Sequence, residues 1–263
     1  MPKTKDDLQL SRARHLNIIK ILKDQPAASI RELAEQLEIS QSTIRRDLDE
    51  LESQGLARRV FGGAILERQV GAEPPFEFRE ALNASAKDKV AKAAADLVVD
   101  GDTVFIDGGT STQFLVKYLA NKKDLTVITC GLNVAYELNK YDNISSFIIG
   151  GELHKDSHSI SGALALAVLE VYKIRCDKSI IAASAVSAEH GVTNRILDRI
   201  PLKRKAMEIS RESILLADGS KIGGTAMGQI ASLDEFSALV TDESVPPDEL
   251  NAIRQMGIRV IVA

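Results

Sequence analysis

The chain has 263 residues, 44% of them hydrophobic and 27% charged, which is typical of a folded globular protein of one large or two modest domains. Its 33 Lys and Arg against 37 Asp and Glu give a net charge of −4, which excludes a polycation that coats nucleic acid or anionic lipid along its whole length. No apolar run approaches the ~18 residues of a membrane span. The polar start MPKTKDDLQLSRARH lacks the apolar segment of a secretory signal, so we expect a cytoplasmic protein with no membrane contact.

The few cysteines and histidines give no metal or disulfide framework. Cys130 and Cys176 form no Cys-x-x-Cys motif, so we expect reduced, buried thiols. His154 and His158 have the spacing of two metal ligands on a helix, but the serines in and after HKDSH favour a loop. We therefore expect no metal and no cofactor. His15 is expected on the surface of the first helix.

Charge is divided unevenly along the chain. The first 70 residues carry 12 Lys and Arg against 11 Asp and Glu, so the excess of negative charge lies in the remaining part. Apolar residues at helical spacing predict three short helices in the first part, over residues 12–23, 30–37 and 41–55. Ser29 and Glu32 have the spacing of a capping box at the start of the second helix.

Two short β-prone runs follow the third helix in LARRVFGGAIL and predict a hairpin. Three helices with a tight turn before the last, then a hairpin, describe a winged helix-turn-helix whose third helix fits a major groove about 12 Å wide. Polar and glycine residues at the start of that helix and in the hairpin are the candidate DNA contacts: Ser40, Gln41, Ser42, Thr43, Arg45, Arg46, Arg58, Arg59, Gly62 and Gly63. A solvated helix face is the alternative interpretation of these arginines.

The rest of the chain alternates helical stretches with short apolar, β-branched runs. These runs are residues 103–107, 125–129, 145–151, 178–186, 213–218, 237–242 and 259–263. Such strands separated by helices are typical of a parallel sheet buried on both faces. The predicted fold class is α/β, with a small N-terminal winged helix-turn-helix domain and then a larger, doubly wound, mostly parallel α/β domain. We place these domains at residues 1–66 and 85–263, with a linker at 67–84.

The strand at 103–107 runs directly into GGTSTQF, so glycines and hydroxyl side chains lie between a strand end and a helix start. Backbone N–H groups, hydroxyls and the positive end of the helix dipole together bind anions such as phosphate. The candidate residues are Gly108, Gly109, Thr110, Ser111 and Thr112. Ser and Thr are also ordinary helix caps, so a capped βα turn is the alternative. The position at a strand's carboxyl end favours a ligand site.

Three cations further along the chain are candidates to complete that site. They are Lys203 and Arg204 in IPLKRKAMEIS and Lys221 in LADGSK, which follows a predicted strand end. Solvated surface charge is the alternative, because Lys and Arg are seldom buried unless they are paired.

The segment SQSTIRRDLDELESQGLARRVFGGA resembles the signature of the DeoR family of bacterial transcriptional regulators, in which a TIRRDL-type recognition helix leads into an R-x-x-GGA wing. The resemblance implies that Ser42, Thr43, Arg45 and Arg46 contact operator DNA. It also implies that the wing residues, Arg59, Gly62 and Gly63, brace against the DNA backbone.

The resemblance continues through DGGTST, TCGLNVA, GGEL, the KR pair and DGSK, which are similar to the effector domain of DeoR-type regulators. That domain is similar to ribose-5-phosphate isomerase and in the family binds phosphorylated sugars or sugar alcohols. The resemblance implies a phosphate loop at Asp107–Thr112, Lys203 and Lys221 as its charged partners, and Asn133 as a contact for a ligand hydroxyl. Departures from the family pattern at Cys130, Arg199 and Gly219 leave the identity of the ligand open.

These features predict a transcriptional repressor of a carbohydrate-metabolism operon, a homo-oligomer, dimer or tetramer, whose affinity for double-stranded operator DNA changes when a phosphorylated sugar or polyol binds. An activator of the same type is the first alternative. An active sugar-phosphate isomerase is the second, but isomerases similar to this domain carry a DGADE-like acidic cluster after a central strand. Here the stretch reads SAVSAEH and leaves only Glu189. We therefore expect no enzymatic activity.

Overall fold

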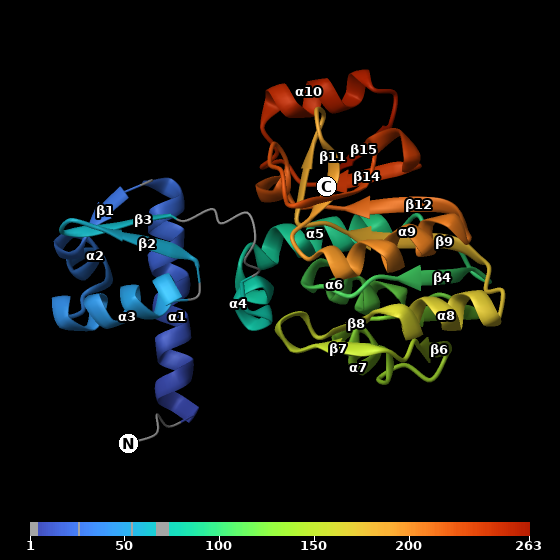
Figure 1. Cartoon of the computed structure of the whole chain (residues 1–263), viewed down its shortest axis with the longest axis horizontal. Coiled ribbons are helices and arrows are strands. Elements are labelled where there is room, and N and C mark those ends of the chain that lie inside the picture. Colours follow the sequence, from blue (N-terminus) through green and yellow to red (C-terminus); the bar gives the residue numbers. More distant parts are fainter. Residues whose placement is uncertain (1–4, 26, 54, 67–73) are drawn as a thin grey trace. The chain divides into compact units, whose positions relative to one another are not determined.

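The computed structural model describes residues 5–25, 27–53, 55–66 and 74–263, and the chain divides into two compact units, Met1–Leu82 and Asn83–Ala263. Figure 1 shows helices and a small sheet in the first unit and a helix-covered sheet in the second. Residues 67–73 of the predicted linker lie outside the described residues. Among the described residues, no helix is both long and apolar enough to cross a membrane.

The N-terminal unit has the predicted three helices and hairpin. Its elements are α1 (Lys5–Asp24), β1 (Ala27–Ser29), α2 (Ile30–Leu37), α3 (Gln41–Ser53), β2 (Ala57–Val60), β3 (Gly63–Leu66) and α4 (Phe76–Ala81). The capping box at the start of α2 is present, with the Ser29 hydroxyl accepting from the Glu32 backbone and the Glu32 carboxylate accepting from the Ser29 backbone. β1, which the sequence analysis did not predict, pairs with β3 and completes a three-stranded sheet in the order β1-β3-β2.

Two features of this unit differ from the expectations. His15 is buried rather than on the helix surface, because its Nε2 lies 3.2 Å from Oδ1 of the buried Asp47 on α3. The predicted linker contains a helix, α4, and Phe78 of that helix packs in the same apolar cluster as Ile44 and Leu48. Burial of the Phe78 side chain stabilises this short helix. The irregular sequence pattern of the segment did not reveal that contact.

The second unit is built on a seven-stranded, entirely parallel sheet in the order β15-β14-β12-β9-β4-β5-β6. The strands are β4 (Thr103–Ile106), β5 (Leu125–Thr129), β6 (Ile144–Ile148), β9 (Cys176–Ala182), β12 (Ser210–Leu216), β14 (Ala238–Thr241) and β15 (Arg259–Val262). The helices are α5 (Ala84–Ala95), α6 (Thr110–Leu119), α7 (Leu132–Leu138), α8 (Ala163–Val171), α9 (Ile200–Glu208) and α10 (Pro247–Gln255). The doubly wound α/β prediction is confirmed.

Helices cover both faces of this sheet (Figure 1). Alternate residues of β4 point to opposite faces, so Phe105 joins the apolar cluster under α8, α9 and α10, whereas Val104 and Ile106 join the cluster under α5, α6 and α7. Cys130 and Cys176 are free and buried, as predicted.

Five short strands make two smaller sheets that the sequence analysis missed. They are β7 (Glu152–His154), β8 (Ser159–Ser161), β10 (Ala185–Ser187), β11 (Gly191–Asn194) and β13 (Gly228–Ala231). The single strand predicted over 178–186 is therefore wrong. The chain leaves the large sheet after Ala182, where the Ser184 N–H donates to the Thr193 carbonyl at 3.0 Å and starts the antiparallel sheet β10-β11-β13.

Candidate functional site

The start of α3 presents a polar surface to solvent. Ser40 precedes the helix, and its hydroxyl accepts a hydrogen bond from the Thr43 backbone at 3.2 Å, which satisfies one N–H of the first turn. Gln41, Ser42, Arg45 and Arg46 are all exposed on this part of the helix. The structure therefore brings the predicted recognition residues together on one exposed helix start.

Asp47, in the same TIRRDL motif, is buried and faces inward, whereas the neighbouring arginines are exposed. Its carboxylate accepts two hydrogen bonds from the Arg14 guanidinium, at 2.8 and 3.0 Å, and lies against His15. Burial opposes ionisation of Asp47, but the hydrogen bonds from His15 and Arg14 outweigh it and lower its pKa. Asp47 thus ties α3 to α1 and fixes which face of α3 is exposed.

The wing is fixed to α3 by a second set of contacts. The Arg59 backbone donates to the Glu52 carboxylate at 2.8 Å, and the Arg59 guanidinium pairs with Asp49. The Gly62 carbonyl accepts from the Ile30 N–H at 2.9 Å, so the hairpin turn also contacts the start of α2. Arg59, predicted to brace against DNA, is therefore occupied in positioning the wing. Its neighbour Arg58 has an exposed side chain.

The tip of the wing carries a residue that the sequence analysis passed over. Phe61 follows β2 and is fully exposed, at 109% of the reference area. Gly62 beside it has a φ of +77°, which glycine adopts at no steric cost. An aromatic residue next to a glycine turn in LARRVFGGAIL was the available signal.

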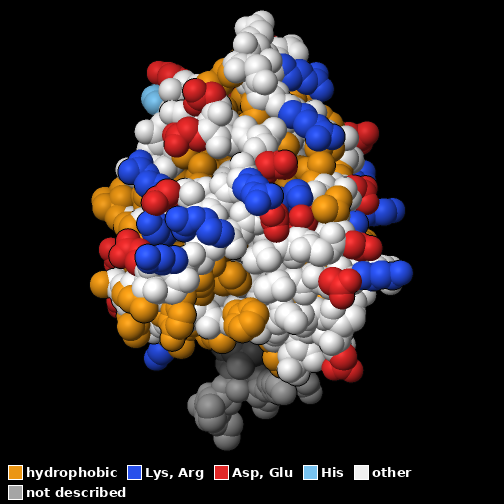
Figure 2. Space-filling view, turned by 90° about the vertical axis from the view of Figure 1, so that its right-hand side faces the viewer, with side chains coloured by type: hydrophobic (Ala, Val, Ile, Leu, Met, Phe, Trp, Pro, Cys, Tyr) orange, Lys and Arg blue, Asp and Glu red, His pale blue; other side chains and the backbone are white. Residues whose placement is uncertain are grey.

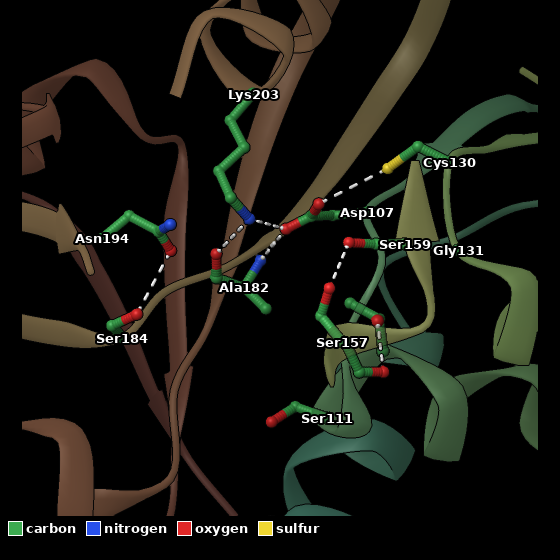
Figure 3. Close-up of polar contacts among 12 residues, drawn as sticks. Asp107, Ser111, Cys130, Gly131, Ser157, Ser159, Ala182, Ser184, Asn194 and Lys203 are labelled. Carbon is green, nitrogen blue, oxygen red and sulfur yellow. Dashed lines mark hydrogen bonds and ion pairs between the residues drawn. The ribbon is translucent and has the colours of Figure 1, made fainter. Parts of the chain in front are cut away.

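The second candidate site lies at the carboxyl ends of β4 and β9, the central strands of the large sheet. The chain proceeds outward from β4 to β5 and β6, then returns to place β9 on the other side of β4. Ligands of open α/β sheets bind at such a reversal of strand order. Figure 3 shows polar side chains from both sides of this point facing the same central region, among them Ser111, Ser159, Asn194 and Lys203.

A buried ion pair occupies the middle of this site. Asp107 directly follows β4, and its carboxylate pairs with the Lys203 ammonium from α9 and accepts from the Ala182 N–H at 3.1 Å. Lys203 also donates to the Ala182 carbonyl at 3.0 Å, and the Cys130 thiol lies 3.7 Å from the other Asp107 oxygen (Figure 3). Burial, followed by the charge of Asp107, raises the pKa of Cys130 to about 12, which keeps this thiol protonated.

The glycine and hydroxyl loop connects this pair to α6. A Cβ on Gly108 would lie 2.6 Å from Cβ of Ser159, so only glycine allows this approach between the two loops. Thr110, Ser111 and Thr112 form the buried first turn of α6, and Gly109, at its N-cap, provides no side chain to satisfy the free N–H groups. The loop has the geometry of an anion site at a helix N-terminus.

Lys221 is the predicted cation that reaches the loop. Its ammonium lies 3.4 Å from the Ser111 hydroxyl although 110 positions separate them in sequence. Burial opposes ionisation of the neighbouring Asp218, but the charge of Lys221 and a hydrogen bond from Ser220 lower the pKa of this carboxylate. Lys221 therefore lies between a carboxylate that stays ionised and the start of α6.

Two residues of this region had no role in the sequence analysis. Lys87, near the start of α5, is buried, and its charge also lowers the pKa of Asp218. Asn83 immediately precedes α5, and its side-chain amide donates to Asp218 at 3.1 Å and to Ser220 at 2.8 Å. A lysine within an otherwise alanine-rich helix, in SAKDKVAKAAA, was a weak signal for the first.

Two other predicted effector residues have different surroundings. Asn133, at the start of α7, is buried, and its amide donates to the Gly109 carbonyl at 2.9 Å, so it supports the loop from behind. The Arg204 guanidinium points away from Lys203 and donates to the carbonyls of Ile230 and Gln229 in β13, at 2.6 and 3.0 Å. The prediction that Arg204 joins the phosphate site does not fit this placement, because successive helix residues point about 100° apart.

A groove of about 670 Å³ lies on α9, β12 and β13 and shares only Arg204 with the predicted effector residues.

His154 and His158 do not form a helical pair, because β7 ends at His154 and a turn of 3₁₀ helix separates them. Across the described residues, no three His, Cys, Asp or Glu side chains gather in a way that would hold a metal ion. After β9 the chain carries Ala183 and Ser184 rather than carboxylates, and the Glu189 side chain is 83% exposed.

Comparison with known proteins matches both units. The model of a DeoR-like helix-turn-helix domain matches residues 14–70, and the model of a DeoR C-terminal sensor domain matches residues 82–243. The chain belongs to the DeoR family. This DeoR-family chain is 31% identical over 247 residues to the glycerol-3-phosphate regulon repressor of Escherichia coli, covering 94% of this chain and 97% of the relative. It is 32% identical to the helix-turn-helix-type transcriptional repressor GlcR of Bacillus subtilis, over 95% of each chain.

Among solved structures, ribose 5-phosphate isomerase A from Neisseria gonorrhoeae matches this DeoR-family chain with a TM-score of 0.39 and 16% sequence identity. The match covers 54% of each chain. A likeness this remote says nothing about chemistry.

Proposed function

We propose that this protein is a transcriptional repressor of a carbohydrate-metabolism operon and that a phosphorylated sugar or polyol modulates its operator affinity. The observation that carries the proposal is the combination, in one chain, of an exposed polar recognition helix and a glycine and hydroxyl loop at the β4–β9 strand ends. Both relatives are named as repressors, and one is named for the regulon of a phosphorylated polyol. We further propose that it acts in the cytoplasm as a homo-oligomer.

On the DNA side, α3 enters the major groove with Gln41, Ser42, Arg45 and Arg46 toward base edges and phosphates. The wing lies beside the groove, where Arg58 and the backbone at Gly62 and Gly63 contact phosphates. Such contacts position the protein, and those from α3 to the base edges specify the sequence. The predicted contacts of Ser40 and Thr43 are less direct, because their hydroxyls hydrogen-bond each other.

The DNA contacts are tested on an operator obtained by selection from random duplexes with the purified protein. Arg45→Ala and Arg46→Ala each weaken binding by ~1–3 kcal/mol where the arginine reads a base, and reduce the salt dependence where it contacts phosphate. Arg211→Ala, which removes the same charge from an exposed position of the second unit, leaves affinity unchanged. Unchanged affinity in both α3 variants would contradict the recognition-helix assignment.

On the effector side, the phosphate occupies the start of α6, with the free N–H groups of that first turn and the hydroxyls of Thr110 and Ser111 as donors and Lys221 as the cation. Thr112 contributes its backbone N–H, because its hydroxyl donates to the Gly109 carbonyl at 3.0 Å. Lys203 is held by Asp107, so this pair contacts the sugar part of the ligand rather than the phosphate. A dianion beside the Asp107 carboxylate would be repelled, which supports this orientation.

A thermal-shift screen against phosphorylated sugars and polyols tests the pocket, because a ligand that binds only the native state raises the melting temperature. We expect a strong response that Lys221→Ala abolishes while operator binding persists. Lys140→Ala, at an exposed lysine paired with Glu137, leaves the response intact. Absence of a response across the whole panel would count against a phosphate-sensing site.

We also propose that the protein has no isomerase activity, since no carboxylate follows β9 where proton transfer would need one. NMR detection of ribose 5-phosphate converting to ribulose 5-phosphate would overturn this.

The names of the two relatives, both repressors, favour repression over activation of transcription. A reporter under the selected operator distinguishes the two, because loss of the protein raises transcription for a repressor and lowers it for an activator.

A further inference from the structure

Helix α8 has an unusual composition for a helix on the surface. Its sequence ALALAVLEV is apolar on every side apart from Glu170. A helix that is hydrophobic all round is normally buried all round. Here only Ala165 and Leu169 are buried, whereas Leu164 is 64% exposed and Val171 is 74% exposed. The helix therefore has one face in the core and a second apolar face without cover from the described residues.

Neighbouring strands extend this apolar face. Phe147 of β6 is in register with Ile128, which belongs to the same apolar cluster as Ala165, so Phe147 lies on the α8 side of the sheet. It is 61% exposed because β6 is the edge strand. Leu153 of β7 pairs with Ile160 of that cluster and is half exposed.

Tyr172, directly after α8, is 75% exposed. We call Phe147, Leu153, Leu164, Val171 and Tyr172 the α8 surface. Figure 2 looks onto the right-hand side of the view in Figure 1, and hydrophobic side chains gather in the lower left of that face. Large exposed apolar surfaces of this kind mark protein interaction sites.

We propose that the α8 surface is the interface through which a second copy of this chain forms a twofold dimer. The proposal rests on the proposed function in one respect, since a helix-turn-helix repressor uses two copies to read two half-sites of an operator. A twofold axis places the same surface on both partners, so the surface must complement itself. None of its five side chains carries a charge, so juxtaposing two copies creates no like-charge repulsion.

The extent and shape of the surface fit this occupant. Five large side chains exposed by half to three quarters leave several hundred Å² of apolar area, a large part of the ~800 Å² that each partner contributes to a standard interface. Leu164 and Val171 lie seven positions apart and so form a stripe along one side of α8. Two such stripes pack antiparallel across a twofold axis as ridges into grooves. Glu170, Lys173 and Arg175 are exposed beside the stripe and supply a polar rim.

Sedimentation velocity of the full chain without DNA or ligand tests the proposal. We expect a mass of at least twice 28.5 kDa at micromolar concentration. Val171→Glu places a charge within the proposed interface and should reduce the mass by at least half. The matched control is Val99→Glu, which makes the same change at a 56% exposed valine before β4 and should leave the mass unchanged. A monomeric wild-type chain, or a Val171→Glu variant of unchanged mass, overturns the proposal.

A milder variant covers the case in which Val171→Glu fails to fold. Tyr172→Ala lies outside α8, adds no charge and should raise the dissociation constant of the dimer about tenfold or more, as expected when a large aromatic side chain is removed from an interface. An unchanged constant overturns the proposal. Because these measurements contain no DNA, their failure leaves operator binding untouched. A chain that binds no operator but dimerises through this surface would instead refute the proposed function alone.

Discussion

Asp47 shows how one residue of the recognition motif serves structure rather than contact. Its carboxylate is buried between Arg14 and His15 of α1, while Arg45 and Arg46, which directly precede it in α3, face solvent. A buried carboxylate that loses its charge leaves those donors without their ionic acceptor. Asp47 therefore sets the orientation on which the DNA contacts depend.

We expect Asp47→Asn to destabilise the N-terminal unit by about 2–3 kcal/mol, because charge-assisted hydrogen bonds in a buried pair are lost. The matched control is Asp49→Asn on the same helix, where the pair with Arg59 is exposed and contributes ~0–1 kcal/mol. Urea unfolding followed by circular dichroism measures both. Equal effects of the two substitutions would contradict the distinction between the inward and outward carboxylates.

The lowered pKa of Asp47 predicts that the stability of the folded chain depends on pH. The pKa of Asp47 is lower in the folded chain than its usual value, so the stabilisation it provides is complete above about pH 4, its unfolded pKa. This contribution is lost as the pH falls through the folded pKa. In Asp47→Asn the contribution is absent at every pH. The stability difference between wild type and variant should therefore shrink on acidification, and a difference that stayed constant down to pH 2 would be inconsistent with an ionised Asp47.

In the second unit, the Asp107–Lys203 pair is the buried ion pair that corresponds to the pair formed by Asp47 and Arg14. Both side chains are buried, and they are 96 positions apart in sequence. Lys203→Met leaves a buried carboxylate without its ammonium, and we expect a loss of ~3–5 kcal/mol. The double variant Asp107→Asn, Lys203→Met removes both charges and should lose less than the sum of the single variants. A double-mutant cycle by chemical unfolding checks this, and strict additivity would show that the two groups do not interact.

At the scale of elements, the two adjacent glycines of the wing have different constraints. A Cβ on Gly63 would lie 2.2 Å from the Ala28 carbonyl oxygen, within the β1–β3 pairing. A Cβ on Gly62 would meet nothing within 4 Å, but the left-handed φ there disfavours any L-residue. Gly62 is therefore a conformational requirement and Gly63 a packing requirement.

We expect Gly62→Ala to cost ~1–2 kcal/mol from backbone strain alone. Gly63→Ala should cost more, since backbone atoms of β1 must move and the wing loses its fixed position beside α3. Unfolding measurements give the order of the two effects. Operator affinity should fall more in Gly63→Ala at a temperature where both variants are folded. A reversed order would mean that β1 adjusts more readily than the turn.

The elements also show where sequence reasoning succeeds and where it stops. Helices α1 to α3 and the positions of the seven strands of the large sheet follow from the pattern of apolar residues in the sequence, although the run predicted at 178–186 continued past the end of β9. β10, β11 and β13 span three or four residues each, too short for a period to register. Their pairing is set by the point at which the chain leaves β9.

For the site residues too, sequence reasoning finds what neighbouring residues encode and misses what depends on distant partners. The loop at 108–112 was identifiable because the glycines and hydroxyls are adjacent in sequence. The inward direction of Asp47 and the outward direction of Arg204 depend on partners far away in the chain, Arg14 and the carbonyls of β13. No local pattern encodes such partners. Sequence therefore located both candidate sites but not the side chains that position them.

At the scale of the whole molecule, the boundary between the two units falls between Leu82 and Asn83, and these two residues have different environments. Leu82 packs against the apolar cluster of the N-terminal unit. Asn83 donates to Asp218 and Ser220, next to Lys221, the cation of the proposed phosphate site. A ligand that moves the 218–221 loop would act on Asn83, and through the chain on the DNA-binding unit. Allostery requires such a differential contact in the two states.

Asn83→Gly tests this connection, because glycine keeps the left-handed backbone at φ 56° and removes only the side-chain amide. With the phosphorylated compound that gives the largest thermal shift, we expect the wild-type operator affinity to change by about 5–150-fold, the usual range of allosteric coupling. In the variant this ratio should approach one while both ligands still bind separately. Ser53→Gly, which removes a hydroxyl from the end of α3, is the control and should keep the ratio. If Asn83→Gly retains the full ratio, the signal travels by another connection between the units.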